Sequence, residues 1–82
     1  MIVITIKDFG STRIEIARKG KSLRGFSKEI GISQSYLSQV LNGKRNPSAS
    51  VAYKIAKGLM LEVEDIFFVN NVANDNPHET NV

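Results

Sequence analysis

The chain has 82 residues, no cysteine, one histidine and a formal net charge of +3. This length favours a single domain, and the lack of cysteine excludes disulfides and thiolate metal sites. A single histidine excludes a histidine cluster around a metal, and no apolar run approaches the ~20 residues of a membrane span. We therefore expect one domain with no metal, no cofactor, no membrane contact and no small-molecule ligand.

Charge is distributed unevenly along the chain. Residues 1–61 hold all 11 Lys and Arg residues but only three acids, a net charge of +8. Residues 62–82 hold five acids and no Lys or Arg, a net charge of −5. A basic surface on a small domain favours a polyanionic partner, with nucleic acid ahead of an anionic membrane. Surface charge that only keeps the protein soluble would give the same composition, so charge alone leaves both interpretations open.

The first residues favour a strand. MIVITIK, at positions 1–7, is apolar and β-branched at almost every position, which is typical of a short strand covered on both faces. The rest of the chain offers no clear second strand. We therefore expect residues 1–10 to form either an extended arm against the helices or a strand that pairs with its copy in a second subunit.

Four segments are predicted to form helices, each beginning at a serine that can cap it: residues 11–20, 22–31, 33–43 and 48–59. In the first, Ile14 and Ala17 share a face that we expect to meet the core. In the last, Val51, Ile55 and Leu59 recur at the spacing of one helical turn.

The end of the chain divides into a short helix and a tail. Residues 62–68 carry acids in their first turn, where the helix dipole favours them, and predict a fifth helix. Residues 69–82 are rich in asparagine and poor in large apolar groups, which predicts a disordered tail. The expected architecture is an all-α fold of five short helices around one core.

Residues 23–42 combine two short helices with a tight turn, and the basic loop NGKRNPS continues from Asn42. The positions that carry the pattern are Phe26, Ser27, Ile30, Gly31, Ile32, Leu37 and Val40. In this register the chain resembles the lambda-repressor/Cro (Xre) family of helix-turn-helix DNA-binding proteins. The resemblance covers roughly residues 11–67 and implies a five-helix lambda-repressor-like domain, which we place at residues 11–68.

Each position in this pattern has a physical role. Phe26 and Ile30 lie one turn apart on the second helix and bury together. Ser27 stands where the family usually has alanine, because a small residue lets the next helix cross closely. Gly31 supplies the left-handed backbone of the turn. The null alternative is a plain helical hairpin without a ligand.

The third helix keeps a polar face once its core positions are removed. Glutamine can bond an adenine edge through two hydrogen bonds, and serine can donate or accept at any base. In the family the start of this helix, here residues 33–42, enters the major groove. The resemblance therefore assigns base reading to four residues: Gln34, Ser35, Ser38 and Gln39. The alternative for each is an ordinary solvated helix surface.

The phosphate backbone is expected to meet the start of the third helix and the loop after it. Ser33 offers a hydroxyl and backbone N–H groups at a helix N-terminus, where anions are favoured. The resemblance adds the other candidates, with Arg24 and Lys28 weaker: Ser33, Tyr36, Asn42, Gly43, Lys44 and Arg45. Many family members carry a phosphate-binding glutamine where Leu23 stands, so that contact does not carry over. Gly25 and the ARKGKS link, residues 17–22, also depart from the family.

These observations predict a sequence-specific transcriptional regulator, either a repressor or a phage or mobile-element switch protein, in a bacterial cytoplasm on the nucleoid. It is expected to bind double-stranded DNA as a homodimer. The candidate dimer surface comprises Ile2, Ile4, Ile66, Phe67 and Phe68. The alternative is an antitoxin-like or protein-interaction module that mainly binds a protein partner. We expect no enzyme, because the acids of the basic region lie apart and no catalytic pair can be built.

Overall fold

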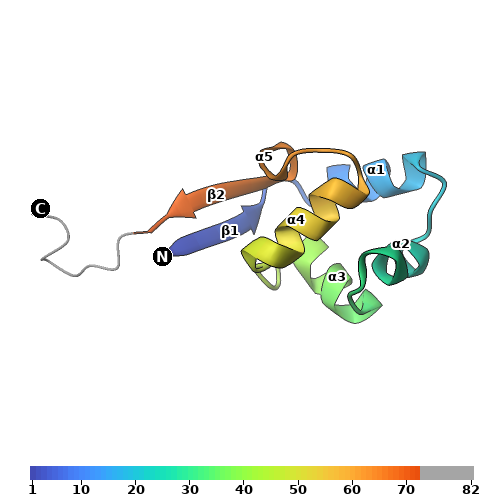
Figure 1. The fold of residues 1–82 in the computed structure, drawn as a ribbon, viewed down its shortest axis with the longest axis horizontal. Coiled ribbons are helices and arrows are strands. Elements are labelled where there is room, and N and C mark those ends of the chain that lie inside the picture. The colour runs from blue at the N-terminus through green and yellow to red at the C-terminus, as the bar shows by residue number, and fades with distance from the viewer. Residues whose placement is uncertain (73–82) are drawn as a thin grey trace, which may run out of the picture.

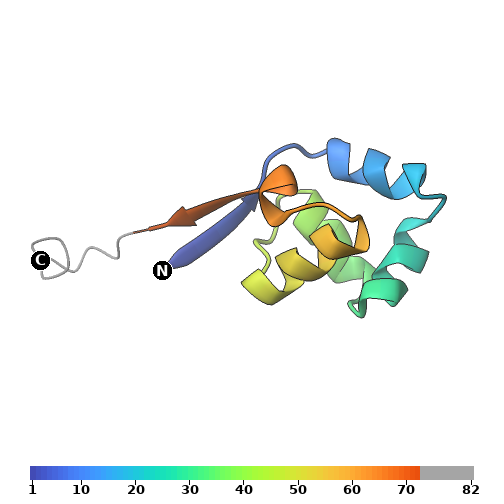
Figure 2. The ribbon, with the colours of Figure 1, turned by 45° about the horizontal axis from the view of Figure 1, so that its top comes forward.

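The computed structural model describes residues 1–72. In chain order they form β1 (Ile2–Ile6), α1 (Ser11–Arg18), α2 (Leu23–Ile30), α3 (Gln34–Leu41), α4 (Ala49–Gly58), α5 (Val63–Ile66) and β2 (Phe67–Asn71). The helices form one body, and the two strands run side by side away from it (Figures 1 and 2). The five predicted helices are confirmed, but the fold also contains a two-stranded antiparallel sheet and is not all-α.

Three of the four predicted serine caps are present. The hydroxyl oxygens of Ser22, Ser33 and Ser48 each accept a backbone N–H three residues further on, at 2.9, 3.1 and 3.2 Å. These bonds satisfy donors that a helix N-terminus otherwise leaves without a partner. The predicted cap at Ser11 is wrong, because Gly10 takes the cap position of α1 and no side chain caps that helix.

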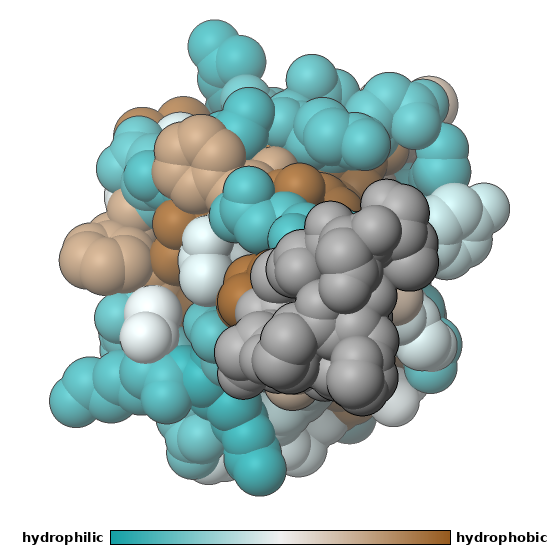
Figure 3. All heavy atoms as spheres, turned by 90° about the vertical axis from the view of Figure 1, so that its left-hand side faces the viewer, coloured by the Kyte–Doolittle hydropathy of each residue, from teal (hydrophilic) through white to brown (hydrophobic). Residues whose placement is uncertain are grey.

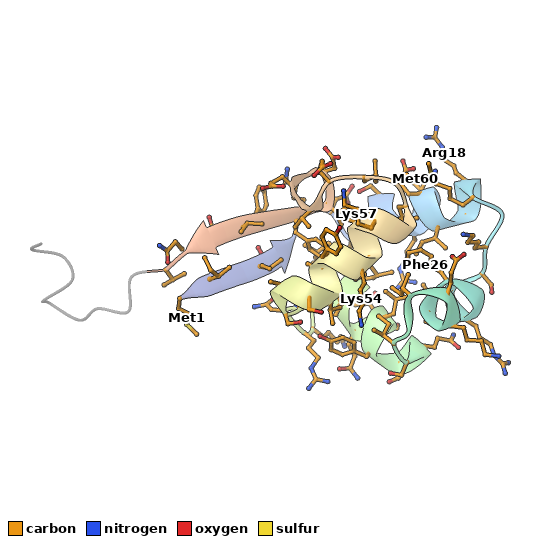
Figure 4. All side chains as sticks on the ribbon, viewed as in Figure 1. Met1, Arg18, Phe26, Lys54, Lys57 and Met60 are labelled. Carbon is orange, nitrogen blue, oxygen red and sulfur yellow. The ribbon has the colours of Figure 1, made fainter. Side chains whose placement is uncertain are left out.

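Every helix and both strands contribute to one hydrophobic core: Ile4, Ile16, Phe26, Leu37, Val40, Leu41, Ala52, Ile55, Ala56, Leu59, Ile66 and Phe67. Phe26 lies inside the helical body (Figure 4) and is fully buried. The predicted inner face of α1 is wrong, since Ile14 and Ala17 are exposed and Ile16 and Thr12 point inward. Apolar residues at 14, 16 and 17 fit two helical faces equally well, so their spacing could not choose between them.

The N-terminal strand pairs within its own chain. β1 and β2 are antiparallel, with Ile2 opposite Asn71 and Ile6 opposite Phe67. The expectations of pairing with a second subunit and of an arm lying on the helices are both wrong for β1. The fifth helix ends at Ile66, and the aromatic and β-branched residues after it extend against β1. Their strand preference is realised only because a partner strand from the other end of the chain lies beside them.

This pairing changes the status of the candidate dimer surface. Ile4, Ile66 and Phe67 are 4%, 5% and 0% exposed, so they belong to the core of a single chain and are not available to a partner. Ile2 and Phe68 remain exposed. The expected tail, residues 69–82, begins inside β2, and residues 73–82 lie outside the described part of the chain.

Candidate nucleic-acid interface

The turn between α2 and α3 has the predicted left-handed glycine. Gly31 has a φ of 81°, and its N–H donates to the Ser27 carbonyl at 2.9 Å. The N–H of Ile32 donates to the same carbonyl at 3.0 Å, which closes the end of α2. Ser27 itself is buried, and its hydroxyl donates to the Arg24 carbonyl at 2.8 Å. The small residue at this close crossing therefore has its polar group satisfied.

The helix α3 has two faces of opposite character. Leu37, Val40 and Leu41 are fully buried and fix the helix to the body. The other side carries two exposed residues, Gln34 and Ser35, and two half-buried ones, Ser38 and Gln39. Within residues 1–72 these four side chains have no hydrogen-bond partner, so their donors and acceptors are available to a ligand.

The start of α3 is arranged to receive an anion. The Ser33 hydroxyl oxygen accepts from the Tyr36 N–H at 3.1 Å, and the Ser33 carbonyl accepts from Leu37. The N–H groups of Gln34 and Ser35, which come before these in the helix, have no preceding carbonyl within reach of the helical pattern. They point out of the helix end, where the dipole also favours negative charge.

The loop after α3 brings its basic residues next to that helix. The N–H groups of Gly43 and Lys44 donate to the carbonyls of Val40 and Gln39 at 3.1 and 2.9 Å. The Arg45 guanidinium lies 5.1 Å from the centre of the Tyr36 ring, in cation–π contact. Lys44 and Arg45 are both exposed. The structure thus groups Tyr36, Lys44 and Arg45 at one edge of the polar face.

Two residues at this edge were missed by the sequence analysis. Arg13 on α1 donates to the side-chain oxygen of Asn42 at 2.8 Å. The Phe9 ring packs over Gly43 so closely that a Cβ on Gly43 would lie 2.6 Å from it. Because Arg13 occupies the oxygen of Asn42, the amide N–H groups of Asn42 stay free to donate to phosphate. No local pattern could reveal a contact between residues 29 positions apart.

The remaining candidates lie outside this group or concern other ligands. Arg24 and Lys28 are exposed on α2. Within residues 1–72 no cluster of three or more His, Cys, Asp or Glu side chains could hold a metal ion. In the same residues, no helix has the length and apolar character needed to cross a membrane.

The sequence was compared with families and with known proteins. The helix-turn-helix family matches residues 14–66. The chain is 44% identical over 46 residues to the Mycobacterium tuberculosis protein named "Uncharacterized HTH-type transcriptional regulator Rv0474", covering 56% of this chain and 33% of that protein. The chain therefore spans a third of that relative's length.

Two shorter relatives are covered more fully. The Bacillus subtilis "Uncharacterized HTH-type transcriptional regulator YvzC" is 41% identical over 51 residues, which cover 62% of this chain and 66% of YvzC. An Archaeoglobus fulgidus protein with the same title is 31% identical over 55 residues, which cover 67% of this chain and 79% of that protein. No solved structure matches at the same level of significance.

The matched residues run from α1 to the end of α5, so the family covers the whole helical body and leaves out both strands. The predicted positions of the helix-turn-helix, from Phe26 to Val40, fall inside this match. The family is a non-enzymatic one, in agreement with the expectation that the chain is not an enzyme. The chain belongs to the Xre/Cro-type helix-turn-helix family.

Proposed function

We propose that this protein is a sequence-specific DNA-binding transcriptional regulator that reads the major groove with α3. One observation carries the proposal: a helix whose inner face is fully buried presents four uncommitted polar side chains in the helix-turn-helix register. Gln34 and Ser35, at the start of the helix, are the most exposed of the four. Amides and hydroxyls of this size suit the donor and acceptor pattern of base edges.

The phosphate backbone would be held on both sides of this face. At the start of α3, the Ser33 hydroxyl and the free backbone N–H groups would bind one phosphate. At the other end, Asn42, Lys44 and Arg45 would contact the strand that follows the groove. Arg13 joins this second group through its hydrogen bond to Asn42. These contacts position the helix, whereas its polar side chains provide the sequence preference.

A single recognition helix reads few base pairs, so we propose a homodimer that binds two half-sites about one helical turn apart. Such a dimer would act as a repressor or switch protein by occupying its operator, and its operator would be palindromic. A reporter placed behind that operator would test repression, because an activator would raise expression instead. A DNA-bound role would place the protein in the bacterial cytoplasm on the nucleoid.

The substitution Gln34→Ala tests base reading. Losing a two-bond contact to a base is expected to cost about 1–3 kcal/mol for the preferred operator and to relax preference at one position. Sites selected from a random DNA pool by the wild type would be titrated with both proteins. Ser11→Ala is the matched control, because Ser11 is exposed on α1 and belongs to neither DNA-binding group. Equal binding of every operator variant by Gln34→Ala and wild type would refute the assignment.

A second candidate function is supported by the exposed apolar side chains on the two strands, which would suit a protein-interaction module of the antitoxin-like kind. Such a module would bind its protein partner with or without DNA. A stoichiometric complex with another protein, combined with no DNA shift at low salt, would favour it. Tight and salt-dependent binding of selected DNA by the isolated chain would favour the regulator.

A further inference from the structure

The two strands form a projection that we call the β-arm, residues 2–6 and 67–71. Figure 1 shows that it extends from the helical body at the end away from α2. Phe68 and Val69 on β2 are 52% and 40% exposed, and Ile2 on β1 is 57% exposed. Figure 3 looks onto this end of the molecule and shows hydrophobic residues at the surface beside hydrophilic ones. A two-stranded sheet with this much exposed apolar surface is marginal by itself.

The register determines which backbone groups of β2 face outward. Val72 donates to the Met1 carbonyl at 2.7 Å, and Lys7 donates to the Ile66 carbonyl at 3.0 Å. Because antiparallel pairs alternate between bonded and non-bonded positions, Val3–Asn70 and Thr5–Phe68 are the bonded pairs between these ends. The N–H and C=O groups of Phe67, Val69 and Asn71 therefore point away from β1.

The outer edge of β2 is open, whereas that of β1 is covered at its centre. Ile4, in the middle of β1, is only 4% exposed, so its outward backbone groups are enclosed by the body. In β2 only Phe67 is buried, and every residue from Phe68 to Asn71 is exposed. Val69 thus occupies the middle of an unpaired strand edge.

None of the usual protections against edge pairing is present. Proteins block open edges with charged side chains, proline or bulges. Residues 66–72 contain no charged residue and no proline, and they pair with β1 in unbroken register. Lys7 lies 5.4 Å from the centre of the Phe68 ring, but it reaches across from β1 and does not shield the opposite edge. The edge of β2 is therefore suited to accept another strand.

Charge identifies a second copy of this chain as the occupant. Residues 1–61 carry a net charge of +8, so two copies repel each other over most of their surfaces. The β-arm is the part of the described chain without charged side chains, and two arms can meet without placing like charges together. An antiparallel strand edge is also self-complementary about a two-fold axis, which is the symmetry of most homodimers.

We propose that two copies pair antiparallel along their β2 edges and form one four-stranded sheet in the order β1–β2–β2–β1. This inference rests on the homodimer of the proposed function and names its interface. It replaces the buried candidates Ile4, Ile66 and Phe67 with Val69 and its neighbours. The bonds are made by backbone groups, and Phe68 and Val69 lose solvent exposure on opposite faces of the joined sheet.

The molar mass of the full chain, measured without DNA by sedimentation equilibrium, tests this proposal. The wild type is expected at twice the chain mass of 9.1 kDa. Val69→Lys places two like charges close together at the two-fold axis and is expected to be monomeric. The matched control is Ile14→Lys, which makes the same apolar-to-lysine change at a residue 59% exposed on α1 and is expected to stay dimeric.

A second variant separates loss of pairing from loss of folding. Val69→Pro removes an N–H that points away from β1, so the β1–β2 ladder keeps its bonds while the outer edge loses a donor. It is expected to be monomeric, with wild-type circular dichroism and an unchanged melting temperature at low protein concentration. A monomeric wild type, or dimers of both Val69 variants as stable as the wild-type dimer, would overturn the proposal. Since DNA is absent, either outcome leaves the assignment of α3 to be judged separately.

Discussion

The helical body and the β-arm bury their apolar side chains to very different extents. Phe26, Leu37 and Ile55 are fully enclosed within the body, whose surface carries the basic residues. In the β-arm, Phe68 and Val69 are at least 40% exposed, and no charged residue surrounds them. A single chain thus completes the body but leaves the β-arm with an open edge. The comparison assigns DNA contacts to the body and self-association to the arm.

The largest expected effect comes from truncating matched residues in the two regions. Leu37→Ala removes a fully buried side chain and is expected to lower the free energy of unfolding by about 2–5 kcal/mol. Val69→Ala removes a half-exposed side chain and should cost less than about 1 kcal/mol in the monomer. Urea unfolding at low protein concentration measures both. Equal losses would show that the β-arm is as well packed as the body, which would break the comparison.

The body was largely predictable because its signals are local. Serine caps at Ser22, Ser33 and Ser48, and the glycine turn at Gly31, each depend on residues within one or two helical turns. The apolar spacing of α3 and α4 likewise identified buried positions such as Leu37 and Ile55. It failed at α1, where two faces fitted equally well.

The β-arm and part of the candidate site were not predictable, because they depend on residues far apart in the chain. β2 was assigned to a helix and a tail, since nothing near Phe68 announces that β1 lies beside it. The bond from Arg13 to Asn42 and the packing of Phe9 on Gly43 also join distant segments. The base-reading assignment of Gln34 and its neighbours stays a prediction.

The next largest effect sharpens the division of labour between the two regions. Arg45→Ala removes a guanidinium held against Tyr36 and, with it, an expected phosphate contact. A bond to a charged group is typically worth about 1.5–3 kcal/mol. Affinity should fall equally for all DNA sequences, and the log–log slope of affinity against salt should decrease by about 0.9.

The control for Arg45 is Arg18→Ala. Arg18 has an exposed side chain that points away from the body at the far end of α1 (Figure 4), where it contacts Glu15 at 3.5 Å. It should change neither the slope nor the affinity beyond the small effect of net charge. Neither variant should alter the molar mass of the dimer. A loss of dimer in Arg45→Ala would show that the basic loop also serves self-association, against the comparison.

The smallest expected effect tests the link between α1 and the end of α3. Arg13→Ala deletes an exposed hydrogen bond of 2.8 Å, which should weaken DNA binding by about 0.5–1.5 kcal/mol. Arg13→Lys keeps the charge but loses the planar donor pair that fits Asn42, so it separates charge from positioning. If Arg13 acts by orienting Asn42, lysine should restore the salt slope but only part of the affinity.

A double-mutant cycle decides whether that link operates through Asn42. When Arg13→Ala is combined with Asn42→Ala, the two losses should be less than additive, because each substitution removes the same bond. Additive losses in DNA affinity would mean that Arg13 acts on DNA directly and not through Asn42. The body would then contact the DNA backbone from α1 as well as from the loop after α3. The dimer mass should be unchanged in every variant, because Arg13 and Asn42 both lie outside the β-arm.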